Sequence, residues 1–334
     1  MSPELTFRGR RVLLVGTDAG TAGAVHSLLR GGAHVTIDAP AATIGATLDD
    51  LVQRGLVTRT TDADHAAYDV VIRARADATP AMAPEASGRP AGRVTLVGGG
   101  LGDPGLLTVA GLEAIRTAEV IVHDRLAPLD ALRHARADAV VIDVGKIPRG
   151  DFTPQETINA VLVEHALAGR DVLRLKGGDN FVFGRGGEEA EACAEAGIPV
   201  VVVPGVSSSI AAPALAGIPV THRALVQGFT VVSGHVPPGD PRSTLDWGAI
   251  ARSNTTIVVL MGVATLGAIA DELTVHGLPP DTPAAVVADA GLPSMRSVRA
   301  PLSRIAEVCV SEGIGAPAVA VVGAVAALDV LAGP

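Results

Sequence analysis

The chain has 334 residues, of which 48% are hydrophobic and 18% charged, so it can bury a core and lacks the composition of a disordered chain. A net charge of −9, no basic run and 2% aromatic residues argue against a nucleic-acid partner or an anionic membrane surface. No signal-peptide pattern opens the sequence, and apolar stretches such as Thr256–Met261 are much shorter than the ~20 residues of a membrane span. We therefore expect a cytoplasmic protein of about two domains.

Several classes of site are disfavoured by the residue inventory. The two cysteines, Cys193 and Cys309, allow neither a disulfide framework nor a four-cysteine metal site, and no His-Glu-x-x-His or Gly-x-Ser-x-Gly motif occurs. We therefore expect no metal. Lysine stands only at Lys146 and Lys176, each beside a glycine. Either the arginine bias of the chain left them there by chance, or these two positions need a compact ammonium.

The N-terminal segment reads as the start of a dinucleotide-type unit. An apolar strand over Arg11–Val15 ends at Gly16 and is followed by a helical pattern, and further strands are expected at His34–Ile37 and Tyr68–Ile72. The proline-containing stretch 77–92 has the composition of a linker. The sequence thus predicts a truncated Rossmann-like domain over 1–76, followed by a linker over 77–92.

From residue 93 onward, strands and helices alternate, which predicts an α/β fold with a largely parallel sheet. The expected strands are Arg93–Val97, Glu119–His123, Ala139–Asp143, Asp171–Leu175, Pro199–Val203, Phe229–Ser233, Thr256–Met261, Ala284–Ala288 and Ala318–Val322. The expected helices are Gly105–Thr117, Pro154–Ala168, Gly187–Ala196, Ser207–Ala216, Ala264–His276 and Leu302–Glu312. The Pro204-Gly205 pair is a candidate hinge, dividing this region into lobes 93–204 and 205–334.

Glycine-rich and polar loops follow several of these strands. Gly98–Gly102 opens the first helix of the region, and Lys176–Glu189 contains five glycines beside charged side chains. Asp124 and Lys146 each end a strand. Because ligands of open α/β sheets bind at the carboxyl ends of the strands, these loops predict the functional site.

These loops together resemble those of the uroporphyrinogen-III C-methyltransferase family, which belongs to the tetrapyrrole methylases. The resemblance runs from Arg93 to Leu331 and rests on VGGGLGDPGLLT, HDRL, VGK, RLKGGDNFVFGRGGEEAEA, VPGVSSSIAAPALAGIPVTHR, SGH and VVLMGV. It implies a two-lobed α/β tetrapyrrole methylase fold with S-adenosylmethionine in the cleft between the lobes, and a homodimer. The implied reaction methylates uroporphyrinogen III to precorrin-2, in siroheme or cobalamin biosynthesis, and leaves S-adenosylhomocysteine.

Residue roles follow from the same resemblance. Asp124 resembles the proton acceptor of the family and Lys146 its proton donor. The positions that resemble cofactor contacts are Leu101, Gly177, Gly178, Asp179, Val182, Ser207, Ser208, Met261 and Ala290. The substrate carries several carboxylates, and Arg125, Arg185 and Arg223 are the arginines expected to pair with them. Leu101 and Asn180 depart from the family pattern, which has proline at both positions.

The N-terminal segment Phe7–Gly16 resembles the opening of the dehydrogenase and ferrochelatase module of siroheme synthases. Asp18 stands at the second glycine of the dinucleotide fingerprint, where a carboxylate obstructs and repels a pyrophosphate. Asp38 is placed to bind a ribose, yet the helical dimerisation part of the module is missing. We therefore expect a degenerate domain without NAD binding. We also expect the region beyond residue 90 to fold and bind S-adenosylmethionine alone.

Two other functions remain open at this point. One is a bifunctional siroheme synthase-like enzyme that also oxidises precorrin-2 with NAD. The other is a non-catalytic protein that binds a tetrapyrrole.

Overall fold

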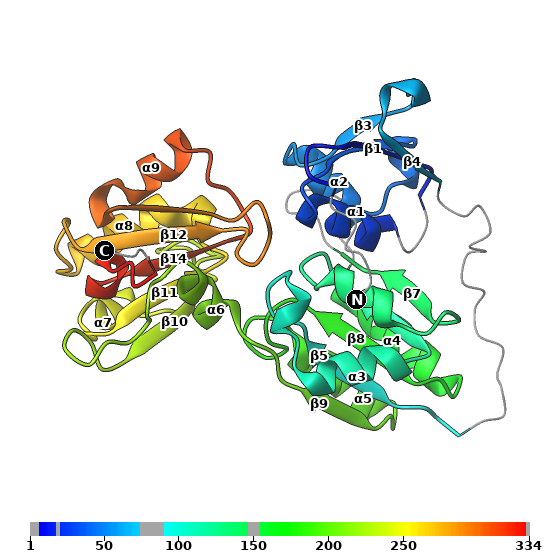
Figure 1. Cartoon of the computed structure of the whole chain (residues 1–334). Helices are drawn as coiled ribbons and strands as arrows, with labels where there is room; N and C mark the ends of the chain where they lie inside the picture. Colours follow the sequence, from blue (N-terminus) through cyan, green and yellow to red (C-terminus); the bar gives the residue numbers. More distant parts are fainter. Residues whose placement is uncertain (1–6, 18–20, 74–89, 146–153, 332–334) are drawn as a thin grey trace. The chain divides into compact units, whose positions relative to one another are not determined.

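The computed structural model describes residues 7–17, 21–73, 90–145 and 154–331. The chain forms two compact units, Met1–Val206 and Ser207–Pro334. Figure 1 labels their helices and strands, with short 3-10 helices denoted η in the text. Parallel sheets with helices between the strands dominate the first unit, and a mixed sheet forms the second.

Unit 1 begins with a four-stranded sheet in the order β3-β2-β1-β4, in which every pairing is parallel. Its strands are β1 (Arg11–Val15), β2 (His34–Asp38), β3 (Thr58–Thr60) and β4 (Val70–Arg73). Its helices are α1 (Thr21–Arg30), η1 (Ala41–Thr43), α2 (Ala46–Gln53) and η2 (His65–Ala67). Val12, Leu13 and Leu14 at the centre of β1 are buried, as a strand covered on both faces requires. The arrangement agrees with the predicted Rossmann-like start.

The second sheet of unit 1 has the order β7-β6-β8-β5-β9 and is also entirely parallel. Its strands are β5 (Val94–Gly98), β6 (Val120–His123), β7 (Val140–Asp143), β8 (Val172–Lys176) and β9 (Val200–Val203). Its helices are η3 (Pro104–Leu106), α3 (Val109–Thr117), η4 (Leu129–His134), α4 (Gln155–Leu167) and α5 (Gly186–Glu195).

Alternating side chains of these strands enter two separate apolar clusters. Val97 of β5 packs in the cluster that contains Ile115 of α3. Leu96, its neighbour on the opposite face, packs in the cluster that contains Leu162 of α4 and Cys193 of α5. The sheet is therefore covered on both faces, and its carboxyl edge is left for the loops that follow the strands (Figure 1).

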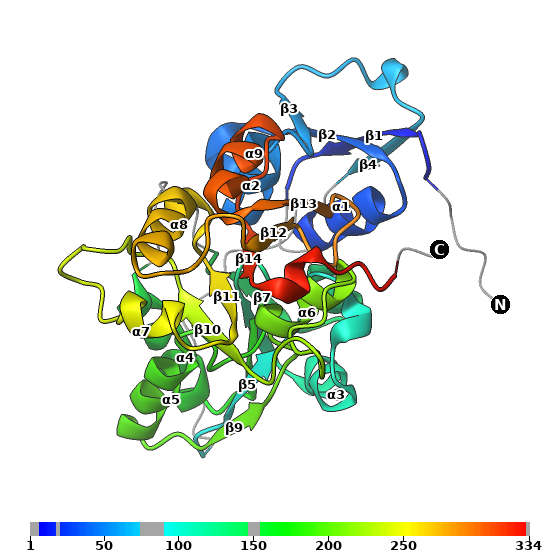
Figure 2. The same ribbon diagram turned by 90° about the vertical axis from the view of Figure 1, so that its left-hand side faces the viewer.

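Unit 2 has a five-stranded sheet in the order β10-β11-β14-β12-β13. Its strands are β10 (Phe229–Ser233), β11 (Thr256–Leu260), β12 (Pro283–Ala288), β13 (Arg296–Pro301) and β14 (Ala318–Val322). Its helices are α6 (Ser208–Leu215), α7 (Trp247–Ala251), η5 (Val263–Thr265), α8 (Leu266–Val275), η6 (Leu302–Arg304), α9 (Ile305–Ser311) and η7 (Ala324–Ala327). Val286 of β12 belongs to the apolar cluster that contains residues of α8 and α9. Its neighbour Ala285 belongs to a second cluster, which covers the opposite face of the sheet. Figure 2 shows α8 and α6 on opposite sides of these strands.

The predicted α/β fold is confirmed, and each strand expected between residues 93 and 322 is present within two residues of its predicted bounds. The expectation of a largely parallel sheet is wrong for unit 2. There β10 and β11 pair in parallel, but β14 runs antiparallel to both of its neighbours, and so does β13 to β12. The β12–β13 connection spans 289–295, too few residues for the crossover that a parallel pair needs.

The helix expected over Gly105–Thr117 begins instead at Val109. Asp103 Oδ1 accepts a hydrogen bond from Gly105 N at 2.8 Å, which closes a 3-10 turn over η3. Thr108 Oγ1 then caps α3 by accepting from Gly111 N at 3.0 Å. Among the α-helices and strands, α2, β3, α7 and β13 lack a sequence prediction, because they are short and, apart from α7, partly polar.

Candidate functional site

Three loops at the carboxyl ends of β5, β8 and β9 pack backbone against backbone. Gly100 N donates to Gly178 O at 3.1 Å, and Gly178 N donates to Gly100 O at 2.7 Å. A Cβ atom on Gly205 would lie 2.2 Å from Gly178 O, and one on Gly98 would lie 2.5 Å from Gly205 N. The glycines predicted to admit a ligand therefore serve first to let the loops approach one another.

Asp179, a predicted cofactor contact, joins two of these loops. Its Oδ1 accepts from Phe181 N at 2.9 Å within its own loop, and its Oδ2 accepts from Gly205 N at 3.0 Å in the loop after β9. The half-buried carboxylate thus helps to position Gly177 and Gly178. Leu101 and Val182, the other predicted contacts in this unit, are also half-buried in these loops.

Asp124 lies directly after β6, and its side chain is 27% exposed. Its Oδ1 accepts from Leu126 N at 3.2 Å, and its Oδ2 accepts from Arg174 Nη2 at 3.4 Å. A carboxylate can accept more hydrogen bonds than these two. Asp124 is therefore oriented by the protein and retains acceptor capacity, which a proton acceptor requires.

Beneath Asp124 lies a buried charge cluster formed by Arg174 and Lys176 of β8 with Glu189 of α5. Glu189 Oε1 accepts from Arg174 Nε and from Lys176 Nζ, each at 3.0 Å, and also from Gln155 Nε2 at 3.3 Å. Burial lowers the pKa of Lys176, and the positive charge of Arg174 lowers it further. Lys176 is thus a buried partner of Glu189.

The predicted substrate arginines of unit 1 have partners on the protein. Arg125 Nη1 lies 2.9 Å from Oδ2 of Asp50 in α2, and the Arg125 side chain is only 10% exposed. Arg185 is exposed, with a left-handed φ of 58°, and its Nε donates to both carboxylate oxygens of Glu188, at 3.0 and 3.1 Å. The adjacent carboxylate raises the pKa of Arg185.

The remaining predicted contacts lie in unit 2. Ser207 caps α6, its Oγ accepting from Ser209 N at 3.3 Å, and Ser208 is half-buried in the first turn of that helix. Met261 follows β11 with a φ of 57° and is 49% exposed. Ala290 follows β12 and is half-buried, whereas Arg223 is exposed.

Strained backbone marks several of these loops. The described non-glycine residues with positive φ are Phe183, Arg185, Asn254, Met261 and Asp289. Apart from Asn254, all of them follow β8, β11 or β12, where the predicted cofactor residues lie. Such strain persists where the surrounding structure enforces it, and it gathers at ligand sites.

Two parts of the prediction lie outside the described residues. Lys146, the predicted proton donor, follows Gly145, the last described residue after β7. Asp18 of the failed dinucleotide fingerprint and most of the predicted linker also fall outside the described ranges.

The sequence analysis assigned no structural role to two polar side chains that hold this site together. Asn180 is fully buried, and its Nδ2 donates to Leu96 O of β5 at 3.3 Å and to Val203 O of β9 at 2.9 Å. Glu189 is equally buried. The sequence did hold a signal for Glu189. Arg174 is a charge within the apolar strand Val172–Lys176, and a buried charge requires a partner.

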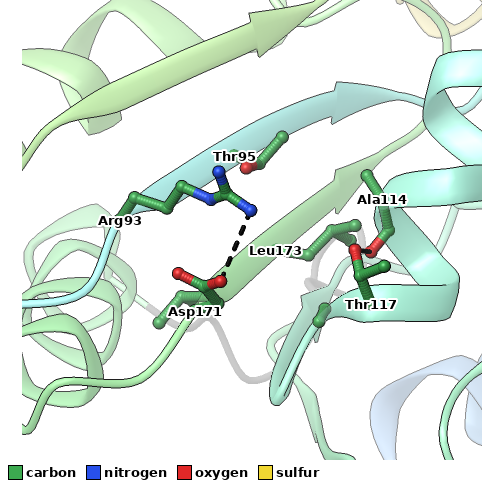
Figure 3. A pocket seen from close by; sticks show the side chains of 8 residues that line it. Arg93, Thr95, Ala114, Thr117, Asp171 and Leu173 are labelled. Atoms are coloured by element: carbon green, nitrogen blue, oxygen red, sulfur yellow. Dashed lines mark hydrogen bonds and ion pairs between the residues drawn. The ribbon is translucent and has the colours of Figure 1, made fainter.

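Two of the hollows on the surface of the described residues lie in unit 1. One lies beside the glycine loop, where the exposed rings of Phe181 and Phe183 line it together with Arg185. The other lies at the amino ends of β5 and β8, the opposite end of these strands from the glycine loops (Figure 3). There Arg93 Nη2 lies 3.4 Å from Asp171 Oδ2, and both side chains are about half exposed.

Among the described residues, no group of three or more His, Cys, Asp or Glu side chains could hold a metal ion. No helix in the described part of the chain has the length and apolarity needed to cross a membrane.

Comparison with known proteins places the chain in one family. The family model for tetrapyrrole (corrin/porphyrin) methylases matches residues 93–306. A uroporphyrinogen III methyltransferase of Methanosarcina barkeri, named as S-adenosyl-L-methionine-dependent, is 47% identical over 241 residues, 72% of this chain and 94% of that protein. A siroheme synthase of Neisseria meningitidis is 46% identical over 237 residues, 71% of this chain. The chain spans about half the length of that curated relative, 48%.

A solved structure gives the same result. Uroporphyrin-III C-methyltransferase from Thermus thermophilus, crystallised with S-adenyl homocysteine, is 41% identical with a TM-score of 0.60, over 70% of this chain and 98% of that one. With the strand order, the glycine loops and these matches taken together, the chain belongs to the tetrapyrrole methylase family.

Proposed function

We propose that the chain transfers methyl groups from S-adenosylmethionine to ring carbons of uroporphyrinogen III, forming precorrin-2 and S-adenosylhomocysteine. The observation that carries the proposal is Asp124, an oriented and partly exposed carboxylate at the carboxyl end of β6. The relative from Methanosarcina barkeri is named for this activity, and the match covers 94% of that relative.

In each unit, loops that follow strands carry residues proposed to contact the cofactor. S-adenosylmethionine, when bound, supplies a methyl group made electrophilic by its sulfonium. The residues that would hold it in unit 1 are Leu101, Gly177, Gly178, Asp179 and Val182, and those in unit 2 are Ser207, Ser208, Met261 and Ala290. Small side chains and backbone polar groups at these strand ends, with the exposed rings of Phe181 and Phe183 beside them, suit an adenine ring with a polar tail.

The side chains of the protein supply proton transfer and orientation. Attack of a ring carbon on the methyl group leaves the tetrapyrrole with one positive charge, which it loses by releasing a proton, and Asp124 accepts that proton as general base. Lys146 acts as proton donor. Arg185 and Arg223 are exposed and pair with substrate carboxylates, Arg185 by exchanging its contact with Glu188. Holding both reactants in line provides much of the rate enhancement.

The assembly is proposed to be a cytoplasmic homodimer that acts on a small molecule without a nucleic acid or a membrane. Light scattering of the purified full-length chain measures the oligomeric state. A monomer at micromolar concentration would contradict the proposed dimer.

The direct test is incubation of the full-length protein with uroporphyrinogen III and methyl-labelled S-adenosylmethionine. We expect label to enter the tetrapyrrole and the product mass to match two added methyl groups. Binding of the tetrapyrrole without transfer of label would contradict the proposal and support a non-catalytic binding protein. Adding NAD to the same reaction tests the bifunctional alternative, in which the product would be oxidised further.

A further inference from the structure

Helix α2 of the first sheet contacts the loop that carries Asp124. Asp50 is 8% exposed, and its Oδ2 lies 2.9 Å from Arg125 Nη1 and 3.2 Å from Arg54 Nη1. Arg125 is the residue next to Asp124, and its side chain is 10% exposed. The Asp50–Arg125 pair is therefore shielded from solvent, and it joins two separate sheets of unit 1.

The first turn of α2 also binds the last residue of β7. Thr47 is buried, and its Oγ1 donates to Asp143 Oδ2 at 3.0 Å. The other oxygen of Asp143 accepts from Gly145 N at 2.8 Å. A Cβ atom on Gly145 would lie 3.3 Å from Arg125 N, so the two loops touch each other. One helix thus holds the segments that lead to both predicted catalytic residues.

Apolar packing supports the same contact. Helix α1 contacts η4, which follows the Asp124 loop directly. Val25 and Leu28 of α1 belong to one buried cluster with Leu129 and Ala131 of η4. Burial of such side chains from water is favourable, so α1 and α2 form a stable support.

We propose that α2 is a positioning element of the methyl-transfer site, in which Asp50 acts through Arg125 to fix the loop that bears Asp124. The inference rests on the proposed function, and it gives the N-terminal sheet a role that requires no dinucleotide. Arg125 is a positioning residue in this arrangement, because its guanidinium is bound by the protein's own carboxylate and is withdrawn from the substrate. Displacing a base by about 1 Å can cost roughly 100-fold in rate, so modest loosening of this loop is measurable.

The test uses full-length variants: Asp50→Asn, Arg125→Gln and the double variant. The matched control is Asp49→Asn, the same change at the adjacent position, where the carboxylate accepts from Gln53 Nε2 within α2. We expect Asp50→Asn and Arg125→Gln each to lower kcat about tenfold and the double variant to fall no further, because both remove one coupled contact. The control should stay within about twofold, and KM for S-adenosylmethionine should not change in any variant.

The division between kcat and KM separates positioning from substrate binding. If Asp50 merely competed with the substrate for Arg125, Asp50→Asn would lower KM for uroporphyrinogen III and leave kcat unchanged. That result overturns the proposal. So does a double variant in which the fold-loss of kcat equals the product of the fold-losses of the two single variants. A fall in kcat shared by Asp49→Asn would also overturn it.

A second readout does not depend on activity. We expect amide hydrogen exchange in a peptide covering residues 124–128 to quicken in Asp50→Asn and to stay unchanged in Asp49→Asn. If Asp50→Asn folds poorly, Thr47→Val removes only the bond to Asp143 and should quicken exchange at residue 145. Unchanged exchange overturns the inference, whereas absence of methyl transfer in the wild type overturns the proposed function instead.

Discussion

Glu189 Oε1 lies 3.0 Å from Lys176 Nζ, and neither side chain is more than 4% exposed. The same oxygen accepts from Arg174 Nε, so one buried carboxylate neutralises two cations of a single strand. Arg174 also reaches Asp124, the proposed general base. This cluster connects helix α5 with the chemistry at the end of β6.

Replacing Glu189 by Gln should destabilise the fold severely. The amide keeps the shape of the side chain but removes the carboxylate that contacts both Arg174 and Lys176, and breaking a buried pair costs about 3–5 kcal/mol. Urea unfolding monitored by circular dichroism measures the change. The control is Glu188→Gln, whose carboxylate pairs on the surface with Arg185, and its effect should not exceed about 1 kcal/mol. Equal effects of the two substitutions would contradict this reading of the cluster.

The lowered pKa of Lys176 predicts a pH dependence of stability. Burial, aided by the charge of Arg174, disfavours the ammonium in the folded state, while the unfolded chain keeps the ordinary pKa of 10.5. Between these two pKa values the unfolded state binds more protons, so the contribution of this lysine to stability rises with pH.

The measurement is the difference in free energy of unfolding between wild type and Lys176→Met as the pH is raised towards 10.5. That difference should shift in favour of the wild type with rising pH and become constant above 10.5. A shift in the opposite direction would mean that the folded state favours the ammonium.

Asp124→Asn should lower turnover by ~10²-fold or more, the usual scale for general acid–base catalysis. The amide can still accept from Leu126 N, so the loop should keep its shape. Affinity for S-adenosylmethionine should change little. Turnover, cofactor affinity and melting temperature are measured on the same variant: a defect confined to KM indicates substrate binding, and a parallel loss of melting temperature indicates a structural role.

Lys146→Arg tests the proposed proton donor. Arginine keeps the positive charge but does not release its proton near neutral pH, so turnover should fall by ~10²-fold. The pH profile of kcat should lose its alkaline limb in the variant. Near-normal turnover would show that position 146 requires charge alone.

NAD should not bind appreciably to the N-terminal sheet, because Asp18 places a carboxylate where the fingerprint needs glycine beside a pyrophosphate. Calorimetric titration of the full-length chain with NAD measures this. Dissociation in the low micromolar range would refute the prediction. Asp18→Gly is the companion variant, and its binding shows whether the rest of the site is intact.

The strands could be predicted because β5, β6 and β8 are short apolar runs bounded by glycine or polar residues. The partner of Arg174 could not be predicted in this way. Glu189 lies on a different element, and the burial of Glu189 depends on how α5 packs against the sheet. The loops were found from their glycines. The close approach of the loops to one another, which several of those glycines permit, required coordinates.

The role of the N-terminal segment was also hidden in the sequence. The linker composition of 77–92 led to the expectation that the region beyond residue 90 is self-contained. In the structure, Leu48 and Leu51 of α2 share one apolar cluster with Leu129 of η4. Composition identifies a linker, but it carries no information on whether the two connected parts also pack together.

The contact among Gly98, Gly178 and Gly205 has a consequence for how this protein tolerates change. Any side chain at Gly98 or Gly205 would place a carbon within 2.5 Å of neighbouring backbone, which cannot yield as the end of a flexible side chain can. A saturation-mutagenesis screen scored by cell growth should therefore reject substitutions at these two glycines as strictly as at Asp124. Selection will then hold fixed a set of positions that take no part in the chemistry.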